Sequence, residues 1–180
     1  MAGTAIARPA SDEYATYFGH YVGLVPEGDV LELLRRQVDE TAALVGKLSD
    51  RDGEYRYAEG KWSIKEVVGH VSDTERIFVY RALCFARGEA VGLPGFDENE
   101  YARHSNAHAR RLEDLVAELR SVRAATLSFF AGLDAAALMR RGTANQRPYS
   151  VRAIPWIAAG HERHHAGILA ERYLPGLERR

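Results

Sequence analysis

The sequence has a single cysteine, almost no net charge and no long apolar run. Cys84 stands alone among 180 residues, which excludes an internal disulfide and a cysteine-rich zinc module and suits a reducing compartment. The 24 basic residues are matched by 25 acidic ones, so no strong positive field can hold a nucleic acid. No apolar run reaches the roughly 18 residues of a membrane-spanning helix. We therefore expect a cytoplasmic protein that binds neither nucleic acid nor membrane.

Several common catalytic motifs are also missing. The sequence contains no Gly-x-Ser-x-Gly elbow, no phosphate loop and no dinucleotide-binding glycine pattern. Strand-forming patterns are rare, and only residues 54–57 have the character of a short extended piece. Length and composition suit one all-helical domain over residues 1–180, with its core bundle over about residues 14–174.

Apolar residues recur with a period of 3.6 in four segments, which predicts a four-helix bundle. The second segment has the clearest start, because Ser63 is followed three residues later by Glu66 in the spacing of a capping box. The fourth carries Pro155 near its first turn, where proline is tolerated. The predicted helices begin at Asp29, Ser63, Ser105 or Asn106, and Ser150, and they end near Ser49, Gly88, Gly132 and Tyr173.

Two connections between these helices are unusually long, at residues 88–104 and 134–149. Long connections in compact domains often cover or build a site. If extended, the first would reach about 50 Å, whereas a helix of some 20 residues is only about 30 Å long. We therefore expect a crossover that can let the second and third helices run parallel.

The seven histidines are the most informative residues. His161 and His165 lie one helical turn apart, on the apolar face that Ile154 and Ile157 define. Two such imidazoles can bind a single divalent ion from one side. The alternative is a pair of hydrogen-bonded or solvated core histidines, because a buried imidazole needs a polar partner of some kind.

A third ligand has to come from another helix, and His70 in the second predicted helix is the best candidate. Gly69 beside it permits the close approach of another element. Glu75 lies on the apolar face of the same helix, where an unpaired carboxylate is costly. It is our candidate catalytic residue, as a general base or as a group that orients a metal-bound imidazole. The alternative is a buried ion pair with an arginine such as Arg172.

Another pair with the same spacing, His104 and His108, precedes the third predicted helix. Ser105 and Asn106 between them resemble a helix cap, and several arginines surround them, which argues against a cation there. His20 and His164 are expected at the surface or at the rim of a site. The aromatic residues Tyr14, Tyr17, Phe18 and Tyr21 are expected to pack an N-terminal segment onto the bundle or to form a pocket wall.

Three segments resemble one known family. Residues 61–76, KWSIKEVVGHVSDTER, are similar to the second-helix signature of the DinB/YfiT-like superfamily, and residues 160–165, GHERHH, are similar to its fourth-helix signature. Residues 93–98, LPGFDE, resemble the loop between the second and third helices. The resemblance extends from about Tyr14 to Tyr173.

This resemblance implies a four-helix bundle with a long crossover after the second helix. It also implies a divalent metal, nickel or zinc in the first place and iron or manganese in the second, bound by His70, His161 and His165. Members of the family are thiol S-transferases that use bacillithiol or mycothiol, or are described as metal-dependent hydrolases, and many form homodimers. We expect such an enzyme, acting on a small molecule that can be a low-molecular-weight thiol. The alternative is a non-catalytic metal-binding protein of the stress response.

Overall fold

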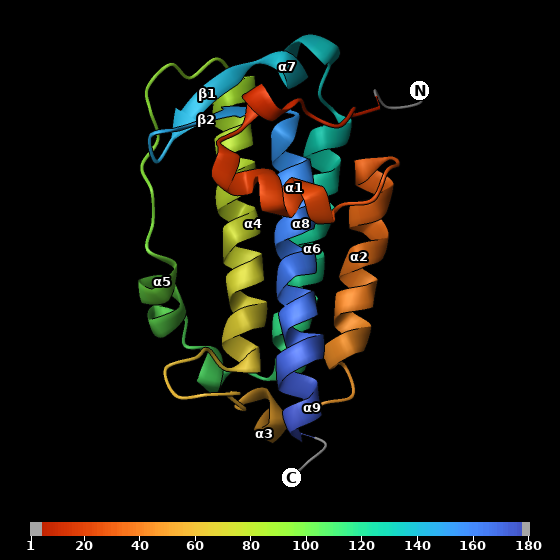
Figure 1. Cartoon of the computed structure of the whole chain (residues 1–180), viewed down its shortest axis with the longest axis vertical. Coiled ribbons are helices and arrows are strands. Elements are labelled where there is room, and N and C mark those ends of the chain that lie inside the picture. The colour runs from red at the N-terminus through yellow and green to blue at the C-terminus, as the bar shows by residue number, and fades with distance from the viewer. Residues whose placement is uncertain (1–4, 178–180) are drawn as a thin grey trace.

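The computed structural model describes residues 5–177, and most of these are helical (Figure 1). The α-helices and strands are, in chain order, α1 (Gly19–Leu24), α2 (Val30–Val45), α3 (Asp50–Gly53), α4 (Ile64–Ala86), α5 (Glu98–His104), α6 (Leu112–Ala131), α7 (Ala135–Met139), β1 (Arg141–Ala144), β2 (Arg147–Ser150), α8 (Ala153–Ile168) and α9 (Leu174–Leu177). Short 3₁₀ turns occur at Ser11–Glu13, Thr16–Phe18 and Ala107–Ala109, and a π-helical turn at Leu169–Tyr173 joins α8 to α9.

Four of these helices, α2, α4, α6 and α8, form the predicted bundle. Helices α6 and α8 each pack against both α2 and α4. Figure 1 shows α4 and α6 running in one direction and α2 and α8 in the other. Neighbouring parallel helices need a connection that returns along the bundle, and residues 87–111 with α5 do this on the outside of α4. The crossover is therefore confirmed.

Local sequence signals explain where the helices start. The Asp29 side chain accepts hydrogen bonds from the backbone N–H groups of Leu31 and Glu32 at the start of α2. Ser63 and Glu66 form the predicted capping box at the start of α4, with the Ser63 N–H donating to Glu66 at 2.7 Å. Pro155 lies in the first turn of α8, as expected.

The third long helix starts later than the sequence predicted. We expected it from Ser105 or Asn106, but α6 begins at Leu112, and α5 and a 3₁₀ turn precede it. Asn106 has a φ of 55°, a left-handed conformation that cannot continue an α-helix. The cap that the sequence suggested at this point therefore ends α5 and does not start α6.

The second long connection contains a hairpin that the sequence did not predict. Strands β1 and β2 pair antiparallel, with Arg141 opposite Ser150. Asn145 and Gln146, with φ values of 50° and 57°, form the turn. Residues 54–57, which we expected to be extended, contribute no strand among the described residues.

Both the crossover and the N-terminal segment are fixed to this framework. The Leu93 N–H donates to the Thr143 carbonyl and the Leu93 carbonyl accepts from the Asn145 N–H, each at 2.9 Å. Helix α1 lies across α8, and Gly160 permits this approach, because a Cβ at that position would lie 1.9 Å from the Tyr21 carbonyl oxygen. The crossover, the hairpin and α1 thus meet beside α4 and α8.

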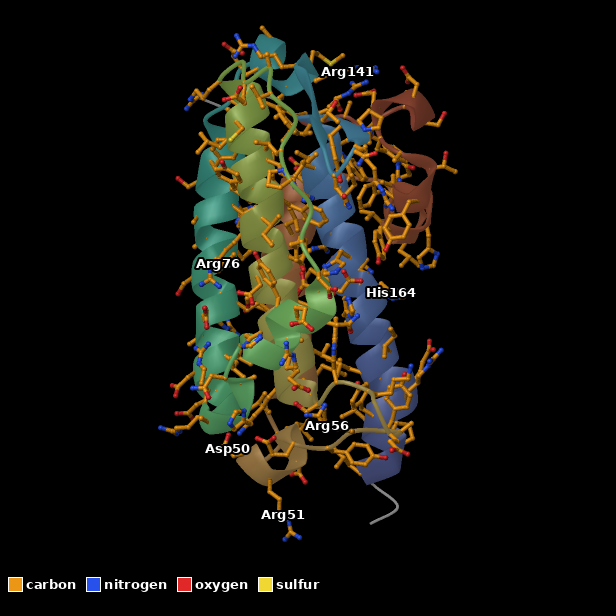
Figure 2. The ribbon with its side chains drawn as sticks, turned by 90° about the vertical axis from the view of Figure 1, so that its left-hand side faces the viewer. Asp50, Arg51, Arg56, Arg76, Arg141 and His164 are labelled. Atoms are coloured by element: carbon orange, nitrogen blue, oxygen red, sulfur yellow. The ribbon has the colours of Figure 1, made fainter. Side chains whose placement is uncertain are left out.

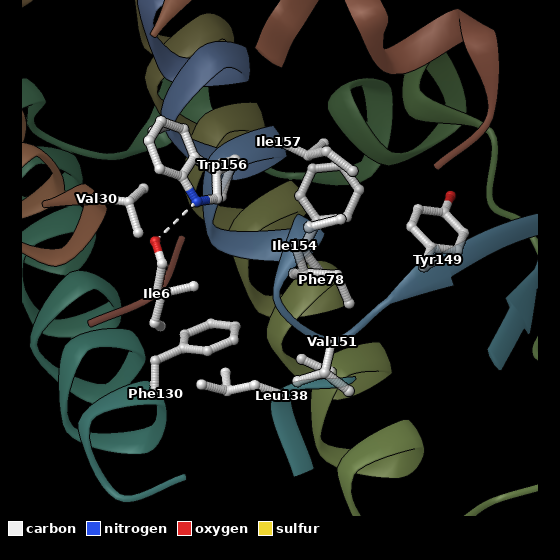
Figure 3. Close-up of a cluster of buried hydrophobic side chains, with 14 of the residues drawn as sticks. Ile6, Val30, Phe78, Phe130, Leu138, Tyr149, Val151, Ile154, Trp156 and Ile157 are labelled. Atoms are coloured by element: carbon white, nitrogen blue, oxygen red, sulfur yellow. Dashed lines mark hydrogen bonds between the residues drawn. The ribbon is translucent and has the colours of Figure 1, made fainter. Parts of the chain in front are cut away.

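Apolar side chains fill both ends of the bundle. The larger cluster lies at the hairpin end, where the Trp156 indole N–H donates to the Ile6 carbonyl at 3.3 Å (Figure 3). A second cluster around Ile64 and Tyr173 fills the opposite end. No helix in the described part of the chain is both long enough and apolar enough to cross a lipid bilayer.

Candidate metal centre

Helix α8 positions two histidines on its face toward α4. His161 is 6% exposed and His165 is half-buried. They lie four residues apart, so their rings occupy adjacent turns of one face, and their Nε2 atoms are 3.1 Å apart. The Tyr21 ring of α1 packs edge-on against the His161 ring, with 5.5 Å between the ring centroids.

Helix α4 supplies the third imidazole. The Nε2 atom of His70 lies 3.0 Å from that of His161, and Thr74 places its hydroxyl oxygen 3.4 Å from the other ring nitrogen of His70. One ligand atom from each of the three histidines lies within 4.8 Å of the other two. The structure thus brings together the three histidines that the sequence singled out.

All three imidazoles are neutral at pH 7. Burial lowers the pKa of His70 to about 4. Burial, together with the neighbouring His70 and His164, lowers the pKa of His165 to about 3. The pKa of His161 is held well below its usual value by burial and by the surrounding histidines. Neutral imidazoles are the form that binds metal ions, because a ring nitrogen then keeps its lone pair.

The converging nitrogens fit a metal ion better than they fit one another. A neutral imidazole has one N–H and one lone pair, so Nε2 of His161 can form a hydrogen bond with only one of its two close neighbours. Two nitrogens bound to one ion at about 2.1 Å are about 3.0 to 3.4 Å apart when the N–metal–N angle lies between a right angle and the tetrahedral angle. The observed Nε2 separations of 3.0 and 3.1 Å agree with this range.

The three histidines lie at one end of a pocket of about 420 Å³, a volume typical of small-molecule sites. The Trp62 ring packs 4.5 Å from the His70 ring, and the Phe78 ring packs 6.0 Å from the His161 ring, measured between centroids. The remaining walls come from Arg81 on α4, from the N-terminal segment through α1, and from the crossover with α5 and the hairpin. These last two groups contribute Tyr17, Phe18, Tyr21, Phe96, Glu98, Arg147 and Tyr149. Of the four aromatic residues in the N-terminal segment, Tyr17, Phe18 and Tyr21 line this pocket, whereas Tyr14 packs against the apolar cluster of the bundle and is not part of the lining.

Glu75 has its carboxylate oxygens committed to other groups. Arg123 on α6 donates two hydrogen bonds to Glu75, at 2.9 and 2.7 Å, and the Thr126 hydroxyl donates a third at 2.7 Å. Arg123 also forms an ion pair with Glu162 on α8, so both carboxylates belong to one buried cluster. The partner of Glu75 is thus Arg123, whereas Arg172 lies at the surface against the Tyr57 ring.

The other histidines lie outside the cluster of three. His104 ends α5, His108 belongs to the following 3₁₀ turn, and both are exposed. His164 lines the pocket, and the exposed His20 contacts it, with ring nitrogens 3.4 Å apart. Figure 2 shows His164 on α8 beside the crossover.

Sequence reasoning missed three charged groups of the pocket, Arg81, Glu98 and Arg147. Arg81 continues the row of His70, Thr74 and Phe78 at helical spacing, and this spacing was the one signal available for it. Glu98 belongs to residues 93–98, which resemble the loop of the family, and no other pattern in the sequence marks it. Arg147 lies in the hairpin that no periodicity revealed.

Comparisons with known proteins agree with this architecture. The sequence profile described as the DinB superfamily matches residues 33–169. Among solved structures, the chain is similar to YfiT from Bacillus subtilis, described as a probable metal-dependent hydrolase with an unusual four-helix bundle topology. The similarity has a TM-score of 0.72 at 14% identity and covers 82% of this chain and 87% of that one. No curated protein sequence shows significant similarity to this chain.

Proposed function

This chain belongs to the DinB superfamily, and from that premise we propose that His70, His161 and His165 bind one divalent transition-metal ion at the active site of a hydrolase. The observation that carries the proposal is the convergence of three neutral Nε2 atoms on one point from two helices. A protein with the same fold is itself described as a probable metal-dependent hydrolase. Imidazole ligands suit zinc and nickel equally.

The surroundings of the three nitrogens favour catalysis over simple metal storage. Within residues 5–177 the group has three members and no further histidine, cysteine or carboxylate joins it. Catalytic zinc sites typically use three protein ligands and leave a position for water or substrate. The pocket adjoins all three histidines, so a small molecule can reach them. When bound, the ion would act as a Lewis acid and lower the pKa of water or of a thiol.

Two side chains of the pocket have the right chemistry to assist. Burial, the neighbouring Tyr17 and then the charge of Glu98 raise the pKa of Tyr21, so its phenol stays protonated and can donate a hydrogen bond to a substrate oxygen. Glu98 is exposed and is the one carboxylate among the described residues that line the pocket. We assign proton transfer to Glu98 in place of Glu75, whose oxygens are held by Arg123 and Thr126.

Elemental analysis of the purified protein tests metal binding directly. We expect one transition-metal ion per chain after reconstitution with zinc or nickel, and loss of that ion in His161→Ala. His108→Ala is the matched control, because His108 is exposed and lies outside the cluster. Failure of the wild-type protein to retain a stoichiometric ion would overturn the proposal.

Activity assays separate the possible uses of the metal. We expect the loaded protein to hydrolyse members of a panel of small esters and amides, with kcat lowered about 10²-fold or more in Glu98→Gln. A parallel panel of electrophiles with bacillithiol or mycothiol tests the thiol-transfer alternative. Turnover in the thiol panel alone would replace the hydrolase assignment, and a bound ion without turnover in either panel would favour the non-catalytic metal-binding protein.

A further inference from the structure

The end of the pocket that lies away from the histidines is built around a buried arginine. Arg81 is 4% exposed, lies on α4 and lines the pocket. It is three helical turns beyond His70, which corresponds to about 16 Å along the helix axis. His70, Thr74, Phe78 and Arg81 are spaced four, four and three residues apart, so one face of α4 forms the floor of the pocket from the imidazoles to the guanidinium.

Arg81 has no anionic partner among the described residues. Its one hydrogen bond goes from Nη2 to the Pro94 carbonyl of the crossover, at 3.1 Å. A guanidinium has five N–H donors, so most of its hydrogen-bonding capacity is unused. Burial lowers the pKa of Arg81, and the Tyr149 hydroxyl acts in the opposite direction. Burying an unpaired charge is costly, and arginines are rarely buried in this way.

Arg123 provides a comparison within the same molecule. It is 1% exposed, but it forms ion pairs with Glu75 and Glu162, and these carboxylates raise its pKa in spite of burial. Two carboxylates of the bundle thus pair with Arg123 in the interior. No carboxylate within residues 5–177 forms an ion pair with Arg81, the buried arginine that faces the pocket.

A second cation lies at the same end of the pocket. Arg147 on β2 stacks on the Tyr17 ring, with its guanidinium carbon 4.3 Å from the ring centroid, and forms no ion pair within residues 5–177. The Tyr149 ring lies 5.9 Å from the guanidinium carbon of Arg81, and the charges of Arg81 and Arg147 both act on its hydroxyl. Figure 3 shows Tyr149 at the edge of the apolar cluster, with its hydroxyl turned away from Val151.

One carboxylate, that of Glu98, lines the pocket among the described residues. The charge of Glu98 acts on Tyr21, whose ring packs against His161. The pocket therefore has the three imidazoles at one end and two guanidinium groups at the other, near the hairpin. Aromatic rings line the space between these ends.

We propose that Arg81, assisted by Arg147 and the Tyr149 hydroxyl, binds the anionic group of a small organic acid whose apolar body lies along Phe78 and Phe18. The anion would be a carboxylate or a phosphoryl group, both of which match the planar fork of a guanidinium. Held at this end, it would direct the other end of the molecule toward the three histidines. The inference rests on the proposed function for the reaction, although binding of the anion does not require the metal.

Matched probes that differ in charge test this inference. Binding of 3-phenylpropanoate, 3-phenylpropanamide and 2-phenylethyl phosphate would be measured by isothermal titration calorimetry at pH 7. We expect at least one of the two anions to bind about tenfold or more tightly than the neutral amide, as a charge-assisted hydrogen bond is typically strong enough to give this ratio. The better anion then identifies the carboxylate or phosphoryl class. Equal affinity of both anions and the amide for the wild-type protein would overturn the proposal.

Variants assign the effect to the guanidinium. In Arg81→Gln the preference for the anion should fall to nearly one, and in Arg147→Gln it should fall severalfold. Arg76→Gln is the control on the same helix, because Arg76 pairs with Glu118 of α6 and lies on the α6 side of α4 (Figure 2). Circular dichroism and elemental analysis check that each variant is folded and binds metal. Unchanged preference in folded Arg81→Gln and Arg147→Gln would also overturn the proposal.

Carboxylates and phosphates can also bind a metal ion directly, so the titrations are repeated on metal-stripped protein and on His161→Ala. We expect the anion preference to persist in both. Its loss together with the metal would show that the anion binds the ion and would overturn the inference while leaving the proposed metal site intact. Conversely, a protein that binds no metal but discriminates acid from amide would retain the anion site and lose the proposed function.

Discussion

Replacement of Arg123 by methionine should destabilise the protein far more than the same change one helical turn earlier in α6. Arg123 lies at the centre of the bundle, where it binds Glu75 of α4, Glu162 of α8 and the Leu34 carbonyl of α2. Removing it would leave two carboxylates in a buried site without a cation. Breaking a buried pair in this way typically costs about 3 to 5 kcal/mol, because the remaining charge stays buried.

Arg120 provides the matched control on α6. Its ion pair with Asp39 of α2 is at the surface, with the two side chains 51% and 62% exposed. Exposed pairs of this kind contribute about 1 kcal/mol or less. Arg120→Met therefore makes the same chemical change on the same helix, but it removes an ion pair that lies at the surface.

The free energy of unfolding of metal-stripped protein at pH 7 would be measured by urea denaturation, followed by circular dichroism. For a chain of this length, a loss of 3 to 5 kcal/mol corresponds to a fall in Tm of about 6 to 20 °C. Adding Glu75→Gln and Glu162→Gln to Arg123→Met should recover part of the loss, because the unpaired charges are then removed. If Arg123→Met costs no more than Arg120→Met, the account of this cluster as the charged centre of the bundle is wrong.

Two further predictions concern packing and pH. Gly160→Ala should destabilise the protein by about 1 to 3 kcal/mol, because its Cβ would meet the Tyr21 carbonyl oxygen at 1.9 Å. The control Gly167→Ala lies on the same helix and has open space around it, so it should be neutral or stabilising by about 1 kcal/mol. Urea denaturation measures both effects. Arg152 lowers the pKa of Glu13 to about 2, whereas a glutamate in the unfolded chain has a pKa of about 4.3. The stability from this ionised group is therefore complete above the unfolded pKa and is lost as the pH falls toward 2. Thermal melts at pH 5.5 and 3 should show a smaller fall in Tm for Glu13→Gln than for the wild type, and equal falls would contradict this account.

The helices were predictable because local signals determine them. The capping boxes and the apolar period lie within a few residues of each other, so the start of α4 at Ser63 could be located from sequence alone. The helical period also placed His161 and His165 on one face of α8. The convergence of His70 with them was predictable only because two interior imidazoles needed a third partner.

The features that could not be predicted depend on which helices pack against each other. The period places Glu75 on a buried face but does not identify the helix that packs against it, so the sequence offers an arginine such as Arg172 as its partner and does not single out Arg123. The hairpin could not be predicted either, because its strands of four residues are too short to show an alternating pattern. Its turn uses Asn145 and Gln146 in left-handed conformations, without the glycine that marks most such turns.

The pocket is assembled from two kinds of structure that are separate along the chain. The three histidines and Arg81 lie on bundle helices, whereas Glu98, Arg147 and Tyr149 lie on the crossover and hairpin. The Leu93 backbone hydrogen bonds join these covering segments to each other, and such bonds place few demands on side chains. Substitutions or insertions in these covering segments can therefore change which molecules fit the pocket, while the helices keep the three imidazoles in place.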